Sequence, residues 1–535
     1  MEINDERLAP PQSKATASAQ IILPCSQQSI SATAEQLAER MKMHDYFSHG
    51  KNVVHVVMEE RISTLDPICA QLLRSESERF GELVRWSKVK DGDMEYAKLL
   101  PSRMRSDDAQ ALLVAIHQRL PKIRALVNFP PLRADGSVQR ARYDSETGLF
   151  CTGPFEVADV SVAEAKALLG CEGLLRDFQF QSKADASRLL AAMLSPGLRF
   201  GPWAQATAPF PLNLTEADKS QSGKGFASEM IASLYGEHMS NISQQGKGGV
   251  GSFDEKIQSE LLKGRPMVCL DNLRGTVDCK MIESFITARG AFSLRAFFRE
   301  GSTDSRSHVL FATSNGIQMT EDLANRALVV RIRKQPQGYR WHRWPDGGVT
   351  GDLLLHLAAN RAQYLGAIYA VLRRWIEAGM PINRTEHAFR DSVGALDWMV
   401  TMVFGCPSLT DGHDEIQQRQ SSPILGFLRE FGEAAGEGEY YASDFLEGAE
   451  EYGLSLPESV AKRMDVGGPP QALGRLLSRA FKEGEGISVD AWSIDRIIKP
   501  RGDGGGGGNS KTYRFTRILE RSPREGWNAP GEAAL

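Results

Sequence analysis

The stretch TEADKSQSGKGFAS, which covers residues 215–228, contains a Ser-Gly-Lys triplet that ends at Lys224. Such a triplet lies at the centre of the phosphate-binding loop G-x-x-x-x-G-K-[ST], whose backbone N–H groups and lysine bind phosphates. Two positions depart from this pattern, because Asp218 replaces the first glycine and Gly225 replaces the hydroxyl residue. The stretch by itself fits either a nucleotide site or a serine-rich surface turn, so the flanking sequence must separate the two.

The residues on either side of the loop have the pattern that a phosphate site requires. A phosphate loop opens a helix, whose N-terminal N–H groups face the anion. The run FPLNLT (residues 210–215) fits a strand, and KGFASEMIASLY (residues 224–235) fits a helix. We expect Lys224 to contact the terminal phosphates, and Gly223 and Gly225 to let the backbone approach them. The predicted ATP-binding loop comprises Asp218, Lys219, Ser220, Gln221, Ser222, Gly223, Lys224, Gly225 and Phe226.

Further polar residues follow apolar runs downstream of the loop. In RPMVCLDN a strand-like run ends in Asp271, and a carboxylate at this position holds Mg²⁺ beside the phosphates in nucleotide hydrolases. Asn272 stands where a water-activating glutamate usually follows. The run HVLFA precedes Asn315, and Arg326 comes before another strand-like run. This order of loop lysine, strand aspartate, strand asparagine and arginine favours the nucleotide site over the surface turn.

The array DKSQSGKG, VCLDN, FATSN and DLANR resembles the core of AAA+ ATPases. Within that group it is most similar to replicative helicases of phages, plasmids and genomic islands, which are related to superfamily-3 and minichromosome-maintenance helicases. The segment PPLRADGSV…YDSETGL resembles a stretch upstream of the ATPase in those proteins, so the resemblance spans residues 128–333. It implies ATP and Mg²⁺ as cofactors and a homo-oligomeric ring, expected to be a hexamer. It also implies that Asn315 senses the terminal phosphate and that Arg326 reaches the neighbouring subunit's nucleotide. The predicted catalytic residues are Lys224, Asp271, Asn272, Asn315 and Arg326, with Asp271 as the metal residue.

The 535 residues exceed what one hydrophobic core accommodates, so we expect several domains. The predicted fold class is α/β: an AAA+ P-loop core with a parallel sheet, a helical N-terminal domain and a C-terminal winged helix. The expected units are a flexible tail (1–30), an N-terminal helical or mixed domain (31–158), the ATPase core (159–345), a helical lid or connector (346–415), a winged-helix domain (416–520) and a tail (521–535).

Composition limits the classes of function. With 41% hydrophobic residues, 24% charged residues and a net charge of −4, the chain is typical of a soluble globular protein without an overall basic excess. Its seven scattered cysteines form no C-x-x-C pair, which argues against a zinc ribbon or a disulfide framework. The polar N-terminus predicts no signal peptide, and no run is long and apolar enough for a membrane. We therefore expect a cytoplasmic protein without a membrane partner.

Two insertions inside the core are candidates for a single-strand contact. Residues 236–255 form a glycine-rich loop with Lys247, and residues 292–307 predict a β-hairpin. The hairpin resembles the pore hairpins of minichromosome-maintenance-type helicases, in which cations and aromatic rings would grip a strand. An ordinary surface hairpin is the alternative. The predicted single-strand contacts are Lys247, Arg295, Arg299 and Arg306.

The last unit, residues 423–518, has the order of three helices and a hairpin, which is typical of a winged helix. From Arg475 to Arg517 it carries nine basic and five acidic residues, although the whole chain is acidic. This basic stretch predicts contact with duplex DNA, and protein packing is the alternative. The predicted duplex contacts are Arg475, Arg479, Lys482, Arg501 and Lys511.

The leading hypothesis is an ATP-driven DNA helicase or translocase that acts as a ring in replication of a mobile genetic element. A second is an origin-binding or helicase-loading protein that uses ATP as a switch with slow turnover, which fits Gly225 and Asn272 in the departing positions. A third is a defence-related NTPase. The water-activating residue stays open between Glu260 and Glu321. A primase or replication partner is expected to be separate, because residues 30–150 show no paired strand carboxylates.

Overall fold

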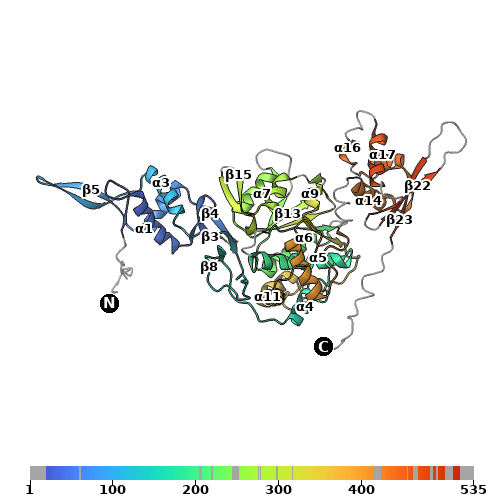
Figure 1. The fold of residues 1–535 in the computed structure, drawn as a ribbon, viewed down its shortest axis with the longest axis horizontal. Helices are drawn as coiled ribbons and strands as arrows, with labels where there is room; N and C mark the ends of the chain where they lie inside the picture. The colour runs from blue at the N-terminus through green and yellow to red at the C-terminus, as the bar shows by residue number, and fades with distance from the viewer. Residues whose placement is uncertain are drawn as a thin grey trace, which may run out of the picture.

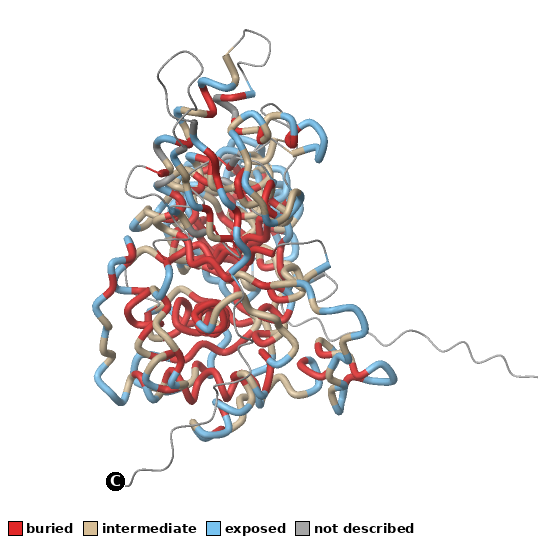
Figure 2. The backbone as a smooth tube through the Cα atoms, turned by 90° about the vertical axis from the view of Figure 1, so that its right-hand side faces the viewer, coloured by how far each residue is buried: buried red, intermediate tan, exposed pale blue. Residues whose placement is uncertain are grey.

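The structure is a computed structural model, and Figure 1 shows three parts along its long axis: an N-terminal part, a central part and a C-terminal unit. Seen along this axis, buried backbone lies mostly inside the molecule and exposed backbone lies around the outside (Figure 2). The residues that the structure describes are 20–59, 62–203, 208–217, 221–243, 252–274, 276–277, 279–296, 299–315, 317–413, 423–454, 456–461, 468–481, 486–489, 492–499 and 510–518.

The central part is built on a six-stranded sheet of order β10-β19-β11-β17-β13-β12. The edge strand β10 is antiparallel to β19, and all other neighbours are parallel, which confirms the prediction of a mixed α/β protein with a parallel sheet. Because the inner strands are covered on both faces, they read as continuous apolar runs such as MVCL and VLFA. The six strands are β10 (Gln179–Phe180), β19 (Ala327–Arg333), β11 (Leu212–Ala217), β17 (Val309–Ser314), β13 (Met267–Leu273) and β12 (Ser240–Ser243).

Helices before and after the sheet strands form most of the remaining core. Helix α5 (Lys183–Phe200) is buried along almost its whole length, because it packs between β19 and the helices α11 and α12. Its polar residues are buried as well, and they are paired there: Arg188 Nη1 lies 3.0 Å from Asp185 Oδ1. Helix α6 (Lys224–Leu234) follows β11 and packs on β11, β13 and β17. The other central helices are α4 (Val162–Leu169), α7 (Phe253–Leu262), α8 (Lys280–Thr287), α9 (Glu321–Ala324), α10 (Leu353–Ala359), α11 (Arg361–Glu377), α12 (Arg390–Trp398) and the π-helical turn η3 (Met399–Phe404).

The N-terminal part is mixed rather than helical: of the two architectures expected for it, helical or mixed, the structure has the mixed one. Short apolar runs cannot be assigned to helix or strand by periodicity alone, and Val-rich runs such as NVVHVVME favour strands once partners are available. The helices are α1 (Ile30–Lys42), α2 (Ala70–Glu76) and α3 (Ser106–His117). The strands form three small sheets: β1 (Ile21–Ile22) with β5 (Leu83–Asp91) and β6 (Met94–Pro101); β2 (Tyr46–His49) with β3 (Asn52–Glu59) and β4 (Ile62–Pro67); and β7 (Ala125–Val127) with β9 (Leu149–Cys151) and β8 (Tyr143–Asp144).

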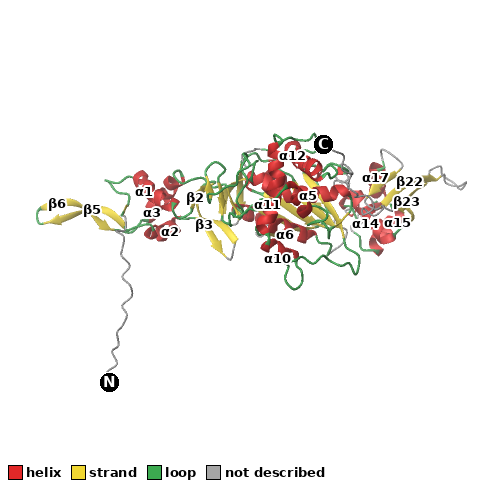
Figure 3. Cartoon of the chain, turned by 90° about the horizontal axis from the view of Figure 1, so that it is seen from below, coloured by secondary structure: helices red, strands yellow, loops and turns green. Residues whose placement is uncertain are grey.

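The predicted hairpin is present as β15 (Ala291–Ala296) and β16 (Arg299–Asp304). The N-terminal part touches it, because a Cβ added at Gly50 in the β2–β3 turn would lie 2.5 Å from the carbonyl oxygen of Ser302. Gly50 has a φ of +56°, so the turn and the close approach both favour glycine. The N-terminal part and the hairpin are therefore in direct contact, whereas the β5–β6 ribbon projects at the opposite end of the molecule from the C-terminal unit (Figure 3).

The C-terminal unit has its own aromatic core, which includes Phe431, Phe445, Trp492 and Phe515. The ion pair between Arg429 Nη1 and Glu216 Oε1, at 3.8 Å, joins this unit to the carboxyl end of β11. Its elements are α14 (Pro423–Ala435), β20 (Gly438–Tyr441), α15 (Ala442–Glu451), α16 (Glu458–Ala461), α17 (Pro469–Ala480), β21 (Gly486–Val489), β22 (Trp492–Lys499) and β23 (Ser510–Arg517), and its sheet order is β20-β23-β22-β21.

Within the described ranges, no helix has the length and apolar character needed to cross a membrane.

Candidate nucleotide site

The structure brings the loop lysine and the predicted sensor asparagine together. Lys224 is the first residue of α6, and Asn315 directly follows β17, the strand beside β11. Lys224 Nζ donates a hydrogen bond of 2.6 Å to Asn315 Oδ1. Burial lowers the pKa of Lys224, the charge of Asp271 opposes this shift, and the charge of Arg274 adds to it. Residues from three segments, the start of α6, the end of β17 and the end of β13, thus lie near one another at the carboxyl edge of the sheet.

A threonine that the sequence analysis did not single out holds the predicted metal residue. Thr313 lies in β17 and is fully buried. Its Oγ1 donates a 2.7 Å hydrogen bond to Asp271 Oδ1 and accepts a 2.8 Å bond from the backbone N–H of Asn272. The only signal for this role was the position of Thr313 in TSN, at the end of the strand that neighbours β13. Thr313 therefore fixes both residues that follow the apolar run of β13.

The prediction that β13 ends at Asp271 needs correction, because the strand runs to Leu273 through an irregularity. Its register with β17 shifts between Leu270 and Leu273, and Asn272 has a φ of +54°, which is uncommon for a residue other than glycine. A bulge of this kind re-aims side chains and is frequent beside active sites. The irregularity falls on Asp271 and Asn272, so it changes the direction in which the side chains at the end of β13 point.

The described half of the phosphate loop has the backbone that its glycine predicts. Gly223 precedes α6 with a φ of +92°, a left-handed conformation that a side chain would strain. Gln221 also has a positive φ of 62°, and Ser222 and the half-buried Phe226 complete the described loop residues. The start of α6 can offer its N–H groups to an anion. Asp218, Lys219 and Ser220 lie outside the described residues.

The residues at this edge fit magnesium bound mainly through a nucleotide. Mg²⁺ keeps several waters and uses one or two carboxylates plus phosphate oxygens, so one aspartate held by a neighbour is a sufficient protein contribution. Asp271 is that aspartate, with Thr313 fixing one of its oxygens. Across the part of the chain that is described, no group of three or more His, Cys, Asp or Glu side chains is placed to hold a metal on its own.

Arg326 lies at the other edge of the sheet. Its carbonyl accepts a hydrogen bond from Leu212, at the amino end of β11, whereas Lys224 lies beyond the carboxyl end. The seven residues of β19 separate the two edges by roughly 20 Å. Arg326 Nη2 pairs with Asp322 at 2.7 Å, and its Nη1 donates to the carbonyl of Glu283 at 3.3 Å. The structure therefore does not bring Arg326 to the site of its own chain.

One candidate for the water-activating residue is also at the wrong edge. Glu260 pairs with Lys263, and its other oxygen lies 3.8 Å from Arg265, which precedes β13 at its amino end. Asp271 lies near the carboxyl end of the same strand. The side chain of Glu321 is not among the described ones.

The predicted DNA contacts lie in different places. Arg295 is exposed in β15, and Arg299 begins β16, so both flank the hairpin turn. Arg306 lies at the base of the hairpin in the short turn η2 (Ser305–Ser307), where its Nε donates to both carboxylate oxygens of Asp304 at 2.9 Å. That hydrogen bond raises the pKa of Arg306. Arg306 is thus committed to Asp304 and separated from the hairpin turn.

In the C-terminal unit, Arg475 is exposed on α17 and Lys511 is exposed on β23. Arg479 belongs to α17 as well, but its side chain is not among the described ones. Lys247, Lys482 and Arg501 are outside the described residues.

No protein-family model matches the chain, and no curated protein matches it. Two solved structures of the NrS-1 C terminal region are similar over most of the chain. The first has 11% sequence identity, and the match covers 83% of this chain and 98% of that chain with a TM-score of 0.30. The second has 13% identity, and the match covers 85% of this chain and 97% of that chain with a TM-score of 0.32. A crystal structure of JCV helicase with a bound acetamide compound is similar at 11% identity over 40% of this chain and 59% of that chain, with a TM-score of 0.22. These TM-scores are too low to carry an argument, so the assignment of the site rests on the geometry of the chain itself.

Proposed function

We propose that the chain is an ATP-driven DNA helicase or translocase that acts as a ring, expected to be a hexamer, in replication of a mobile genetic element. The observation that carries the proposal is the contact of Lys224 with Asn315 beside the Asp271–Thr313 pair, at the carboxyl edge of a parallel sheet. Ligands of open α/β sheets bind at this edge. A lysine, a carboxylate and an amide at the start of a helix are the groups that phosphoryl transfer requires.

In this proposal, each residue of the site contacts either the phosphates of ATP or the magnesium. Lys224 leaves its hydrogen bond to Asn315 and binds the terminal phosphates, while the N–H groups of α6 cradle the others. Asn315, freed from Lys224, donates its amide to the terminal phosphate. Asp271, oriented by Thr313, would hold the magnesium, which would neutralise charge on the phosphates.

The position of Arg326 supports the proposed ring. In a ring, an arginine at the edge opposite its own site would serve the site of a neighbour, and an arginine supplied in this way stabilises the charge of phosphoryl transfer. Within such a ring, the β15–β16 hairpin with Arg295 and Arg299 would hold the single strand, and the C-terminal unit would contact duplex through α17 and β23 as a winged helix.

A second candidate function is an ATP switch with slow turnover, as in an origin-binding or helicase-loading protein. Two residues favour it: Gly225 offers no hydroxyl to magnesium, and Asn272 has no carboxylate to activate water. Hydrolysis that rises with single-stranded DNA, together with strand displacement, supports the helicase. Tight ATP binding with neither property supports the switch.

The nucleotide assignment is tested by Lys224→Ala, with Lys280→Ala, an exposed lysine on α8, as the control. A charged hydrogen bond contributes about 1.5–3 kcal/mol, so the loss of even one phosphate contact should weaken ATP binding about 10- to 150-fold. The affinity for ATP is measured by calorimetry on both variants. Equal affinity of Lys224→Ala and the parent would show that the loop does not bind the phosphates.

A further inference from the structure

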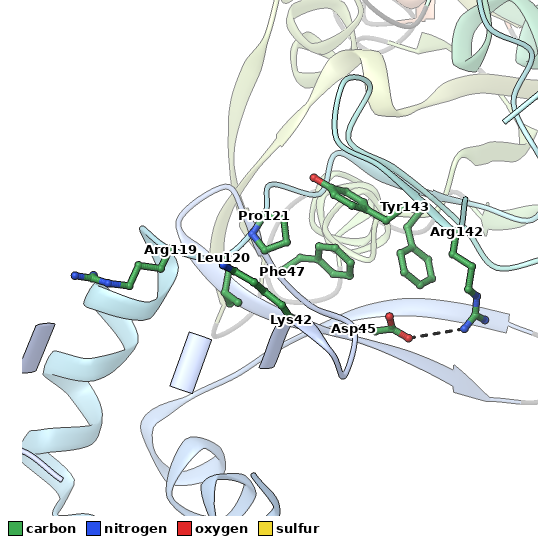
Figure 4. A pocket seen from close by; sticks show the side chains of 9 residues that line it. Lys42, Asp45, Phe47, Arg119, Leu120, Pro121, Arg142 and Tyr143 are labelled. Carbon is green, nitrogen blue, oxygen red and sulfur yellow. Dashed lines mark ion pairs between the residues drawn. The ribbon is translucent and has the colours of Figure 1, made fainter. Parts of the chain in front are cut away.

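A cavity of about 490 Å³ lies in the N-terminal part, where α1, β2 and the end of α3 meet β8 and β9 (Figure 4). It is separate from the nucleotide site, because all residues that line it lie between Lys42 and Phe150. Pockets of this size accommodate a single small ligand or one unit of a polymer. The side chains that line the cavity indicate which kind of ligand it binds.

Three aromatic rings form one side of the cavity. Phe47 and Phe150 are almost fully buried and meet edge to face, with centroids 5.4 Å apart. Tyr143 is half-buried, its ring centroid lies 5.0 Å from that of Phe47, and its hydroxyl donates a 2.8 Å hydrogen bond to the carbonyl of Lys122. The ring of Tyr143 is therefore fixed by Phe47 and by the carbonyl of Lys122, and it still reaches solvent. A ring on which a ligand stacks must have both properties.

The rim of the cavity is basic. Arg142 is exposed over 56% of its side chain, lies 5.5 Å above the ring of Phe150 and pairs only loosely with Asp45, at 3.9 Å. Lys42 lies on another side, where it pairs with Glu39 at 2.6 Å. Arg119 adds charge, but Figure 4 shows its guanidinium directed away from the rings, and it donates to the neutral oxygens of Ala115 and Ser31.

We propose that this cavity binds one unpaired nucleotide of a single-stranded nucleic acid, with the base on Tyr143 and the adjoining phosphates at Arg142 and Lys42. Aromatic platforms beside cations are how proteins hold single strands, because every base has a stacking face and every linkage a negative charge. A paired base is stacked within its duplex and does not enter. An acidic polypeptide would use the cations but would leave the ring of Tyr143 without a role.

The position of the cavity adds a reason to favour a nucleic-acid strand. Phe47 lies in β2, and the turn that follows β2 contains Gly50, which abuts Ser302 of β16. The cavity and the β15–β16 hairpin are thus joined by one short strand. A nucleic-acid strand held at Tyr143 would lie close to the hairpin, whatever the role of the ATP site.

The first experiment compares full-length Lys42→Glu/Arg142→Glu with a control of equal charge change, Arg374→Glu/Arg384→Glu, at exposed positions of the central part. Anisotropy of a labelled oligo-dT of about 10 nucleotides, within the site size of such proteins, is measured without ATP. Two lost phosphate contacts should lower the salt slope of log affinity by about 1.4. We expect the cavity variant to bind oligo-dT at least tenfold more weakly than the parent. The control variant should keep the affinity and the salt slope of the parent. Equal binding and slope in the two variants would overturn the proposal.

The second experiment isolates the base. Tyr143→Ala should weaken binding of the intact oligonucleotide about tenfold, and should leave binding of an abasic oligonucleotide of equal length unchanged. If Tyr143→Ala unfolds at a lower temperature than the parent, Tyr143→Leu serves the same test, because leucine keeps an apolar contact with Phe47. A loss that is the same for both oligonucleotides would overturn the base site and leave a general polyanion surface.

Discussion

Gly225 stands where the complete phosphate-loop pattern has the hydroxyl residue that binds magnesium, so it is one of the two departures of the proposed loop. A Cβ added to it would meet nothing within 4 Å, so a larger side chain fits without displacing neighbours. We predict that Gly225→Ser strengthens the dependence of ATP binding on Mg²⁺, because the new hydroxyl can bind the metal as in the complete loop pattern. The measurement is the affinity for ATP with and without Mg²⁺.

Gly225→Ala is the matched control for that substitution. Replacing glycine near the start of a helix reduces the freedom of the unfolded chain, which stabilises by about 0.4–1 kcal/mol for either residue. The difference between serine and alanine therefore reports the hydroxyl alone. If both variants show the same ratio of affinities with and without Mg²⁺, the hydroxyl does not reach the metal and the assumed geometry of the loop is wrong.

The residues of the site differ in how far the sequence could predict them. Lys224 and Asn315 were predicted as site residues, and they are in contact. Lys224 begins the helix after β11, Asn315 directly follows β17, and the carboxyl ends of these two strands share an edge. Thr313 was not, since its hydrogen bonds to Asp271 and Asn272 depend on the register between β13 and β17. The start of β13 and the end of β17 are more than forty residues apart in the chain, and no local pattern reports a register at that distance.

At the scale of elements, the same limit explains why the sequence left the N-terminal part open between a helical and a mixed domain. Strand β1 pairs with β5, and β7 pairs with β9, so each of these strands depends on a partner outside the window in which periodicity is read. The helices α1 and α3 carry their own signals within one window, such as the cap at Ser29 and the apolar stripe of α3. Long central strands and helices were therefore predictable, and the small sheets were not.

The C-terminal unit allows a prediction about duplex DNA. Deletion of residues 420–535 should lower duplex affinity and flatten its salt dependence, because each lost phosphate contact removes close to one unit of slope. Deletion also removes Arg429, which pairs with Glu216 beside the phosphate loop. A variant that keeps this pair, Arg475→Glu with Lys511→Glu, separates the two effects and should reproduce the loss of duplex affinity. Duplex binding that survives both changes would assign the unit to protein packing.

At the scale of the whole molecule, buried histidines predict the response to acid. Burial lowers the pKa of His308 and His413 to about 3 and of His49 and His387 to about 4. Below their usual pKa near 6.5 the unfolded chain binds protons that the folded chain does not, so the free energy of unfolding falls as the pH decreases. Burial raises the pKa of Glu237 to about 7, which acts in the opposite direction between about pH 7 and 4.5.

The four buried histidines lower the stability of the folded chain in acid, and Glu237 alone raises it. The net effect is a loss of stability as the pH decreases. Each fully engaged group changes the free energy of unfolding by about 1.4 kcal/mol per pH unit. We therefore expect the midpoint of urea unfolding to be lower at pH 5 than at pH 7, measured by circular dichroism. His308→Gln, whose side chain does not titrate, should reduce the difference between the two pH values. A midpoint that is equal or higher at pH 5 would contradict the assignment of these histidines as buried and neutral.

The central claim is that the nucleotide site is completed by a second subunit, and Arg326 tests it most directly. Its contact with Asp322 at i, i+4 spacing contributes only a few tenths of a kcal/mol to an isolated helix, so its removal should leave the fold intact. In a ring, Arg326→Ala should bind ATP nearly as the parent does and lose hydrolysis by roughly 10³–10⁵-fold.

The decisive measurement is the rate of ATP hydrolysis when Arg326→Ala protein is mixed with Lys224→Ala protein, each inactive alone. Some junctions in the mixed ring pair the intact Lys224 of one variant with the intact Arg326 of the other, so partial activity should return. If Arg326→Ala hydrolyses ATP at the rate of the parent, or if mixing restores nothing, the sites are not shared between subunits and the proposed ring helicase is contradicted.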